Sequence, residues 1–157
     1  MFWKGIFGFG LLCAAAAPAS AGWQYTNWNM NPEEAVAASK GAMALGTGTP
    51  GQRIEGLAVG AVGSYQAGSR TFKATFYFKN NKLSLVMLET KETPRCYALA
   101  NDLKGVYGKP FDSSESSITV TNTWQDAKAQ NFVALLAIGD SCSLSYKPLV
   151  SEDASGL

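Results

Sequence analysis

Histidine is absent from all 157 residues of the chain. Its absence removes Ser-His-Asp and Cys-His nucleophilic systems, His-ligated zinc and the usual general base near neutral pH. The acidic residues nowhere show the spacing of an EF-hand calcium loop. The enzyme chemistry that remains is a carboxylate pair, as in glycoside hydrolysis, or a lysine-based system. The sequence therefore favours a protein that is not an enzyme and that has no metal site and no cofactor.

The chain has three cysteines, Cys13, Cys96 and Cys142. Cys13 lies within residues 1–21, which we expect to be cleaved off as a signal peptide, as the next paragraph explains. Two cysteines in an exported chain most often form a disulfide, and there is no histidine to activate a reactive thiol. Closing the loop of about 45 residues between them is worth ~4 kcal/mol on chain-entropy grounds. We therefore expect a structural disulfide between Cys96 and Cys142.

Residues 1–21 have the features of a secretory signal peptide. A short positive start is followed by an apolar, uncharged run over 5–17 and by the Ala-Ser-Ala of residues 19–21, an A-x-A cleavage signal. The run is too short to span a membrane, and Leu12 before Cys13 does not fit a lipoprotein signal. We expect cleavage after Ala21, a mature chain in the periplasm or secreted, and no stable membrane anchor.

The overall composition is that of a globular domain, with 46% hydrophobic and 16% charged residues. The chain has thirteen basic and twelve acidic residues. Cleavage of the leader removes Lys4 and leaves twelve of each, so we expect a mature net charge of zero. Scattered charges without a basic stripe argue against nucleic-acid binding and against recruitment to anionic membranes. We expect a single domain over 22–150 and a polar, mobile tail over 151–157.

Residues 71–91 predict a β-hairpin, around which the rest of the chain is arranged. Apolar residues alternate along its first half, and Asn80-Asn81 suits a two-residue primed turn. That turn predicts three apolar pairs on one face: Phe78 opposite Leu83, Phe76 opposite Leu85, and Ala74 opposite Met87. The hairpin then needs a helix or a second sheet against this face.

The other face of the hairpin is semi-apolar because it carries Tyr77, Val86 and Leu88. Two interpretations are open: these residues form an interface for a partner, or the N-terminal arm covers them. The same register places Glu89 on the apolar face opposite Phe72. There it could act as an acid with a raised pKa, but pairing with a nearby Lys or Arg is the favoured interpretation.

Trp23, Tyr25 and Trp28 form an aromatic stretch at the mature N-terminus. They could stack on a ligand such as a sugar ring, or pack over the core, and packing is favoured. Gly46 to Gly51 fits G-x-G-x-x-G by letter. A phosphate loop needs a strand before it and a helix after it, and here the order is reversed, so we interpret it as a connection.

Two helices are predicted by matching start signals. Asn31-Pro32 with Glu34 forms a capping box, and this helix is expected to run to about Ala44 with Val36, Ser39 and Met43 on its buried side. Thr93-Pro94 opens the second helix. Its apolar face consists of Cys96, Leu99, Leu103 and Val106, and Gly108 is placed to end it. Lys109 to Ser117 is expected to be a polar loop.

Strands are predicted over 57–66, 118–124, 131–138 and 142–148, in addition to the hairpin. A three-residue turn over 139–141 would set Ile138 opposite Cys142, Leu136 opposite Leu144 and Ala134 opposite Tyr146. The fold class is therefore α+β: two αβββ halves forming one antiparallel sheet, with both helices packed on one face.

The tandem helix-plus-strands plan resembles the β-lactamase inhibitor protein and the small outer-membrane assembly lipoproteins. Several stretches also resemble small exported bacterial proteins. They are residues 29–36, the Phe76-Tyr77-Phe78 hairpin, residues 103–110 and the final strand from Cys142 to Tyr146. The resemblance implies an exported, non-enzymatic binding or inhibitor-like module whose partner is another exported protein or a cell-envelope component. The alternative is a carboxylate-based hydrolase of a cell-envelope polysaccharide, with Trp23 to Trp28 stacking on sugar.

Overall fold

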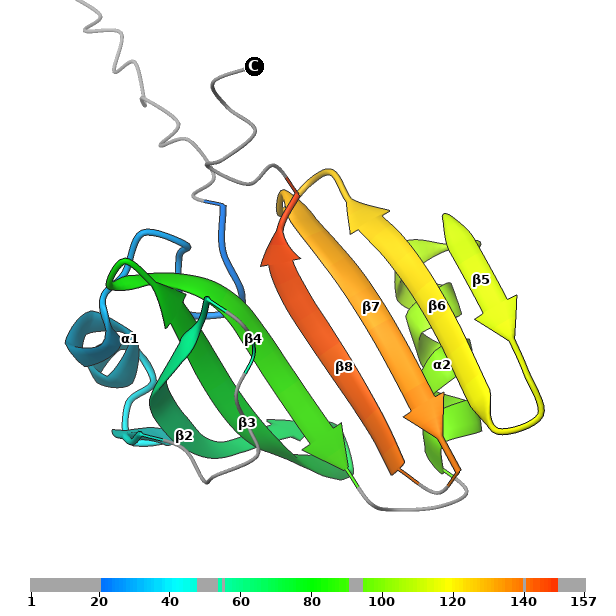
Figure 1. Cartoon of the computed structure of the whole chain (residues 1–157), viewed down its shortest axis with the longest axis horizontal. Helices are drawn as coiled ribbons and strands as arrows, with labels where there is room; N and C mark the ends of the chain where they lie inside the picture. Colours follow the sequence, from blue (N-terminus) through cyan, green and yellow to red (C-terminus); the bar gives the residue numbers. More distant parts are fainter. Residues whose placement is uncertain (1–20, 48–53, 55, 91–94, 140, 150–157) are drawn as a thin grey trace, which may run out of the picture.

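The structure is a computed structural model that describes residues 21–47, 54, 56–90, 95–139 and 141–149. Its elements are α1 (Pro32–Ala38), β1 (Met43–Leu45), β2 (Ala58–Ala67), β3 (Arg70–Lys79), β4 (Lys82–Thr90), α2 (Arg95–Tyr107), β5 (Asp112–Glu115), β6 (Thr119–Asp126), β7 (Asn131–Ile138) and β8 (Ser141–Pro148). The strands form one antiparallel sheet in the order β1-β2-β3-β4-β8-β7-β6-β5 (Figure 1). One antiparallel sheet with two helices is the predicted α+β class. The predicted leader, apart from Ala21, and the predicted tail lie outside the described residues.

Each helix is followed by four strands, where the sequence predicted three. The additional strands β1 and β5 are short and lie at the two edges of the sheet. β1 exists because α1 ends at Ala38 and does not reach Ala44. The Ser39 hydroxyl donates to the Val36 carbonyl (2.6 Å) and accepts from the Met43 N–H (3.0 Å), so the chain turns and Met43 pairs with β2. β5 lies within the predicted polar loop over 109–117, and all four of its residues are exposed.

The start of α1 and the end of α2 agree with the predicted signals, whereas the end of α1 does not. At α1 the Asn31 side chain accepts from the Glu34 N–H (2.9 Å) and the Glu34 carboxylate accepts from the Asn31 N–H (3.0 Å), so the capping box is confirmed. The predicted start of the second helix at Thr93-Pro94 lies outside the described residues. Val106 is 72% exposed and not on the buried face, because Tyr107 packs against the core in its place.

The hairpin of β3 and β4 contains a β-bulge that changes its register. Asn80 and Asn81 both have positive φ (50° and 62°) and Phe78 pairs with Leu83, as predicted. The next pair is Tyr77 with Leu85, so Ser84 is an extra residue on β4. Beyond the bulge the predicted pairs of Phe76 and Ala74 are wrong by one residue, because their partners are Val86 and Leu88.

The β7–β8 hairpin is also one residue away from the predicted register. Ile138 pairs with Ser141, Leu135 with Leu144, and Val133 with Tyr146. The turn therefore has two residues, starting at Gly139 with φ 54°. Cys142 faces the core as predicted, but Val133, Leu135 and Ala137 accompany it, whereas Leu136 and Ile138 face away.

Both helices and the N-terminal arm, residues 21–30, cover the same face of the sheet, which we call the inward face. One buried cluster contains Trp23 of the arm, Ala35 of α1 and Leu99 of α2 together with Phe76 and Leu144 of the sheet. Figure 1 shows α2 behind β6 and β7, with the front of these strands free of any helix. The opposite face, which we call the outer face, is therefore free of helices at β6 and β7, whereas Thr75 and Tyr77 on the outer face of β3 are buried.

Candidate functional site

The aromatic arm is part of the core. Trp23 is 2% exposed, and its ring makes edge contacts with Tyr65 (4.8 Å between centroids), Phe76 (5.6 Å) and Tyr25 (5.7 Å). Trp28 is buried too. The arrangement matches the favoured interpretation, packing over the core. A sugar ring could not stack on Trp23 or Trp28 without the arm leaving the sheet.

Asn131 at the start of β7 holds the arm in place. Its Oδ1 accepts from the Trp28 indole N–H (3.0 Å), and its Nδ2 donates to the Gly22 carbonyl (2.8 Å). At the other end of the arm, the Leu83 N–H donates to the Met30 carbonyl (2.9 Å). The arm thus joins β7 to β4 across the inward face.

The three residues of the predicted interface are buried. Val86 and Leu88 face inward as a result of the bulge, with 0% and 2% exposure, and belong to the core cluster. Tyr77 lies on the outer face but is 1% exposed. Burial raises the pKa of the Tyr77 hydroxyl, and the Glu89 carboxylate raises it further. None of the three side chains is accessible to a partner in this structure.

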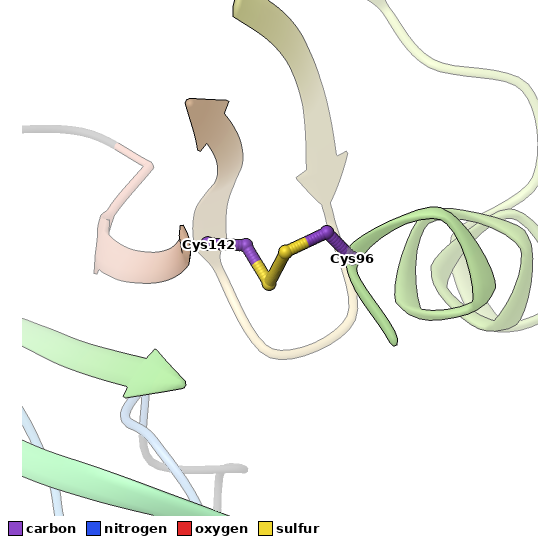
Figure 2. Close-up of a disulfide and its surroundings, with 2 residues drawn as sticks. All are labelled: Cys96 and Cys142. Atoms are coloured by element: carbon purple, nitrogen blue, oxygen red, sulfur yellow. A yellow bond between two sulfur atoms is a disulfide. The ribbon is translucent and has the colours of Figure 1, made fainter. Parts of the chain in front are cut away.

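Cys96 and Cys142 form a disulfide, as predicted, with Cα atoms 5.7 Å apart (Figure 2). Cys96 lies in the first turn of α2, and Cys142 lies near the start of β8 opposite Thr90 of β4. Both cysteines are buried in the core cluster. The bridge therefore ties α2 to the centre of the sheet, where β4 meets β8.

Glu89 does not face Phe72, because the bulge moves it to the outer face opposite Lys73. Its carboxylate lies 3.6 Å from the Lys73 ammonium, and both side chains are about half exposed. This is the favoured interpretation, pairing with a basic neighbour at a strand end. No group of three or more His, Cys, Asp or Glu residues that could hold a metal ion occurs among the residues that the structure describes.

Among the residues that the structure describes, burial raises the pKa of several tyrosines, most strongly that of Tyr146. Burial raises the pKa of Tyr146, whose hydroxyl is hydrogen-bonded to that of Tyr107, and the nearby Tyr107 adds to the rise. Burial also raises the pKa of Tyr65 and Tyr25. These hydroxyls lie in the core around Trp23 and are uncharged near neutral pH. The Tyr25 hydroxyl is buried without a hydrogen-bond partner, so it is the ring of Tyr25, and not its hydroxyl, that contributes to the packing of the arm.

The outer face carries an apolar surface that the sequence did not predict. Leu85 and Met87 of β4 are half-buried there, and Leu136 and Ile138 of β7 are 37% and 50% exposed. We call these four side chains the outer patch. The signal in the sequence that could have revealed the patch is a strand with apolar residues on both faces. Few polar residues occur in Leu83 to Leu88 of β4 and in Phe132 to Ile138 of β7.

Small side chains of β8 separate the two halves of the outer patch. Ser145 pairs with Met87 on one side and with Ala134 on the other, and Ser143 lies between Glu89 and Leu136. Two strand spacings of ~4.8 Å and an offset of two residues along the strands put Met87 and Leu136, the nearest residues of the two halves, roughly 12 Å apart. Charged groups border the patch: Lys73 with Glu89, and Lys147, whose ammonium lies 4.6 Å from the Phe132 ring centroid.

Comparisons with known proteins identify no relative: no family model, no curated protein and no solved structure matches the chain. No helix in the described part of the chain is both long enough and apolar enough to cross a membrane.

Proposed function

We propose that the chain is an exported, non-enzymatic binding module that docks another exported protein on the outer patch. The observation that carries this proposal is the position of Leu136 and Ile138, two large apolar side chains side by side on a sheet face without a helix. Flat apolar surfaces bordered by charges are the usual centre and rim of protein interfaces. The small side chains of β8 keep the surface flat, which suits a protein better than a small ligand.

Export is supported by the signal-peptide pattern of residues 1–21 and is compatible with the disulfide between Cys96 and Cys142. Intact-mass analysis of the exported protein tests this part. The expected mass starts at Gly22 with both cysteines oxidised, and a mass that includes earlier residues or a lipid would contradict it.

We also propose that the chain consists of two related halves. The strand order is symmetric about the β4–β8 pair, and each half contains one helix followed by four strands. This plan supports the resemblance to the β-lactamase inhibitor protein and the outer-membrane assembly lipoproteins. The outer patch is then a composite surface, because β4 belongs to the first half and β7 to the second.

The test is a crosslinking pull-down from periplasmic extract with the oxidised protein and with two patch variants, Leu136→Lys and Ile138→Lys. A saturable protein partner should be lost in both, since truncated or charged hot-spot residues commonly cost more than ~1 kcal/mol, or about fivefold in affinity. The matched control is Tyr97→Lys, because Tyr97 is an exposed apolar residue of α2, on the other side of the sheet. Equal capture by all three variants would refute the outer patch.

A further inference from the structure

A second surface feature, separate from the outer patch, is a pocket of about 450 Å³ beside the end of α2. Its lining residues are Lys104, Gly108, Lys109, Pro110, Ser113 and Asn122. They come from the last turns of α2, the connection to β5, β5 itself and β6. Asn122 alternates with the outward-facing Thr121 and Thr123, so the pocket lies on the inward side of the sheet, opposite to the outer patch.

The pocket carries uncompensated positive charge. Lys104 and Lys109 both line it, and in the described part of the chain neither forms an ion pair. Lys73, by contrast, is paired with Glu89, and Lys147 lies over the Phe132 ring. Two ammonium groups at one concave surface favour a negatively charged ligand.

Asn122 adds an amide donor to the two lysines. Its side chain is 4% exposed, and its Oδ1 accepts from the Ser113 hydroxyl at 2.8 Å. That hydrogen bond fixes the amide and leaves Nδ2 as the free donor, because no residue that the structure describes accepts from it. Nδ2 is not one of the fully buried polar atoms that lack a partner, so it is open to solvent, and an anionic ligand in the pocket could accept from it in place of water.

The last carbonyls of a helix carry partial negative charge, so the end of α2 favours the two lysines and not the anion, and the lysines must outweigh it. Two carbonyls at this end already have donors, one in the last turn of α2 and one just after the helix. The Lys104 carbonyl accepts from the Gly108 N–H (2.9 Å), and the Gly108 carbonyl accepts from the Trp124 indole N–H (3.0 Å). The positive φ of Gly108 (80°) turns the chain away from the helix at this point.

Apolar groups complete the pocket. The Pro110 ring and the methylene stems of the two lysines form part of its wall. Phe111, which follows the lining residue Pro110 in the chain, is 71% exposed. A ligand with an apolar body as well as a charged head would contact more of this surface than an inorganic ion would.

We propose that this pocket binds a small organic anion, with its carboxylate or phosphate head held by Lys104, Lys109 and the Asn122 Nδ2 and its apolar body against Pro110. Either head group has the oxygen acceptors that ammonium and amide donors need. The site is independent of the proposed protein partner, so either proposal can fail alone.

The test is a titration of the ¹⁵N-labelled, oxidised protein by NMR with benzoate, phenyl phosphate, inorganic phosphate and the neutral benzyl alcohol. The two organic anions should give saturable shifts of the amides of residues 104–113 and 122 at concentrations up to about 10 mM. Lys104→Gln and Lys109→Gln should each weaken binding about two- to fivefold, as for exposed charge pairs. Lys128→Gln, an exposed lysine in the β6–β7 turn, should leave the affinity unchanged.

Three results would overturn the proposal: benzyl alcohol binding as well as benzoate, the Lys128 variant losing as much affinity as the pocket variants, or no shift in this region with either organic anion. Inorganic phosphate binding as tightly as phenyl phosphate would overturn the apolar part of the ligand. Comparing benzoate with phenyl phosphate distinguishes a carboxylate from a phosphate head.

Discussion

The register of the central hairpin can be tested by two neighbouring alanine substitutions, Leu88→Ala and Met87→Ala. Leu88 is 2% exposed on the inward face next to Leu144, whereas Met87 is half-buried on the outer face next to Ser145. Leu→Ala removes three carbon atoms, worth about 2.4 kcal/mol at ~0.8 kcal/mol each. The cavity that remains brings the loss of unfolding free energy to about 3 kcal/mol, within the usual range for buried leucines.

Met87→Ala should lower the free energy of unfolding by only about 1 kcal/mol, because the Met87 side chain is half-buried and already partly exposed to solvent. The measurement is urea unfolding of both variants and of the unsubstituted protein under oxidising conditions, followed by tryptophan fluorescence, with the m-values compared. A hairpin without the bulge would place Met87 inward and Leu88 outward, and the order of the two losses would then be reversed. Equal losses, or a larger loss for Met87→Ala, would refute the inward position of Leu88.

Three further predictions concern the links between distant parts of the chain. Paired Cys96→Ser and Cys142→Ser substitutions should lower the unfolding free energy by about 4 kcal/mol, since the bridge closes a loop of 46 residues; reductant should then have no further effect on urea unfolding. Asn131→Ala should cost about 1–3 kcal/mol by leaving the Trp28 indole N–H and the Gly22 carbonyl without their partner, and near-UV circular dichroism should report the loosened tryptophan; an unchanged spectrum and stability would contradict the anchoring of the arm. Burial raises the pKa of Tyr146 above its ordinary value, so the folded state keeps a proton that the unfolded chain loses near pH 10, and stability should fall as the pH rises beyond about 10. Urea midpoints near pH 8 and near pH 11 should differ less for Tyr146→Phe than for the unsubstituted protein, and an identical pH dependence would contradict this assignment.

Local signals in the sequence predicted the features that depend on a few neighbouring residues. The Asn31–Glu34 capping box, the Asn80-Asn81 turn and the stop at Gly108 each depend on local backbone chemistry. The disulfide between Cys96 and Cys142 was predicted by counting the cysteines outside the predicted leader.

Strand register was predictable only where one face of the strand is polar. β4 and β7 have apolar residues on both faces, so a shift by one residue replaces one apolar set by another, and the hydrophobic pattern cannot choose between them. The extra residue Ser84 and the two-residue turn at Gly139 make that choice in the structure. Both errors in register concern which apolar residues face outward. On β4 the register decides between Val86 and Met87, and on β7 it decides between Leu135 and Leu136.

The outer patch was missed for this reason. An open sheet with one covered face normally alternates apolar and polar residues, and strands that are apolar on both faces depart from that pattern. Leu85, Met87, Leu136 and Ile138 could have been found by that departure alone, without knowing the register, because one of the two apolar sets of each strand must face away from the helices.

The pairing of β4 with β8 at the centre of the sheet has a consequence for how the chain folds. The partner of β4 is β8, the last strand among the residues that the structure describes, and the arm is fixed by Asn131, 109 residues after Gly22. Contacts this distant in sequence form slowly. Until Ser141–Pro148 has been synthesised, the first half presents an open strand edge beside Val86 and Leu88, which is the kind of edge that recruits other chains. A nascent or truncated chain that ends before β8 should therefore depend on a chaperone or aggregate, whereas a chain that includes β8 covers this edge of β4.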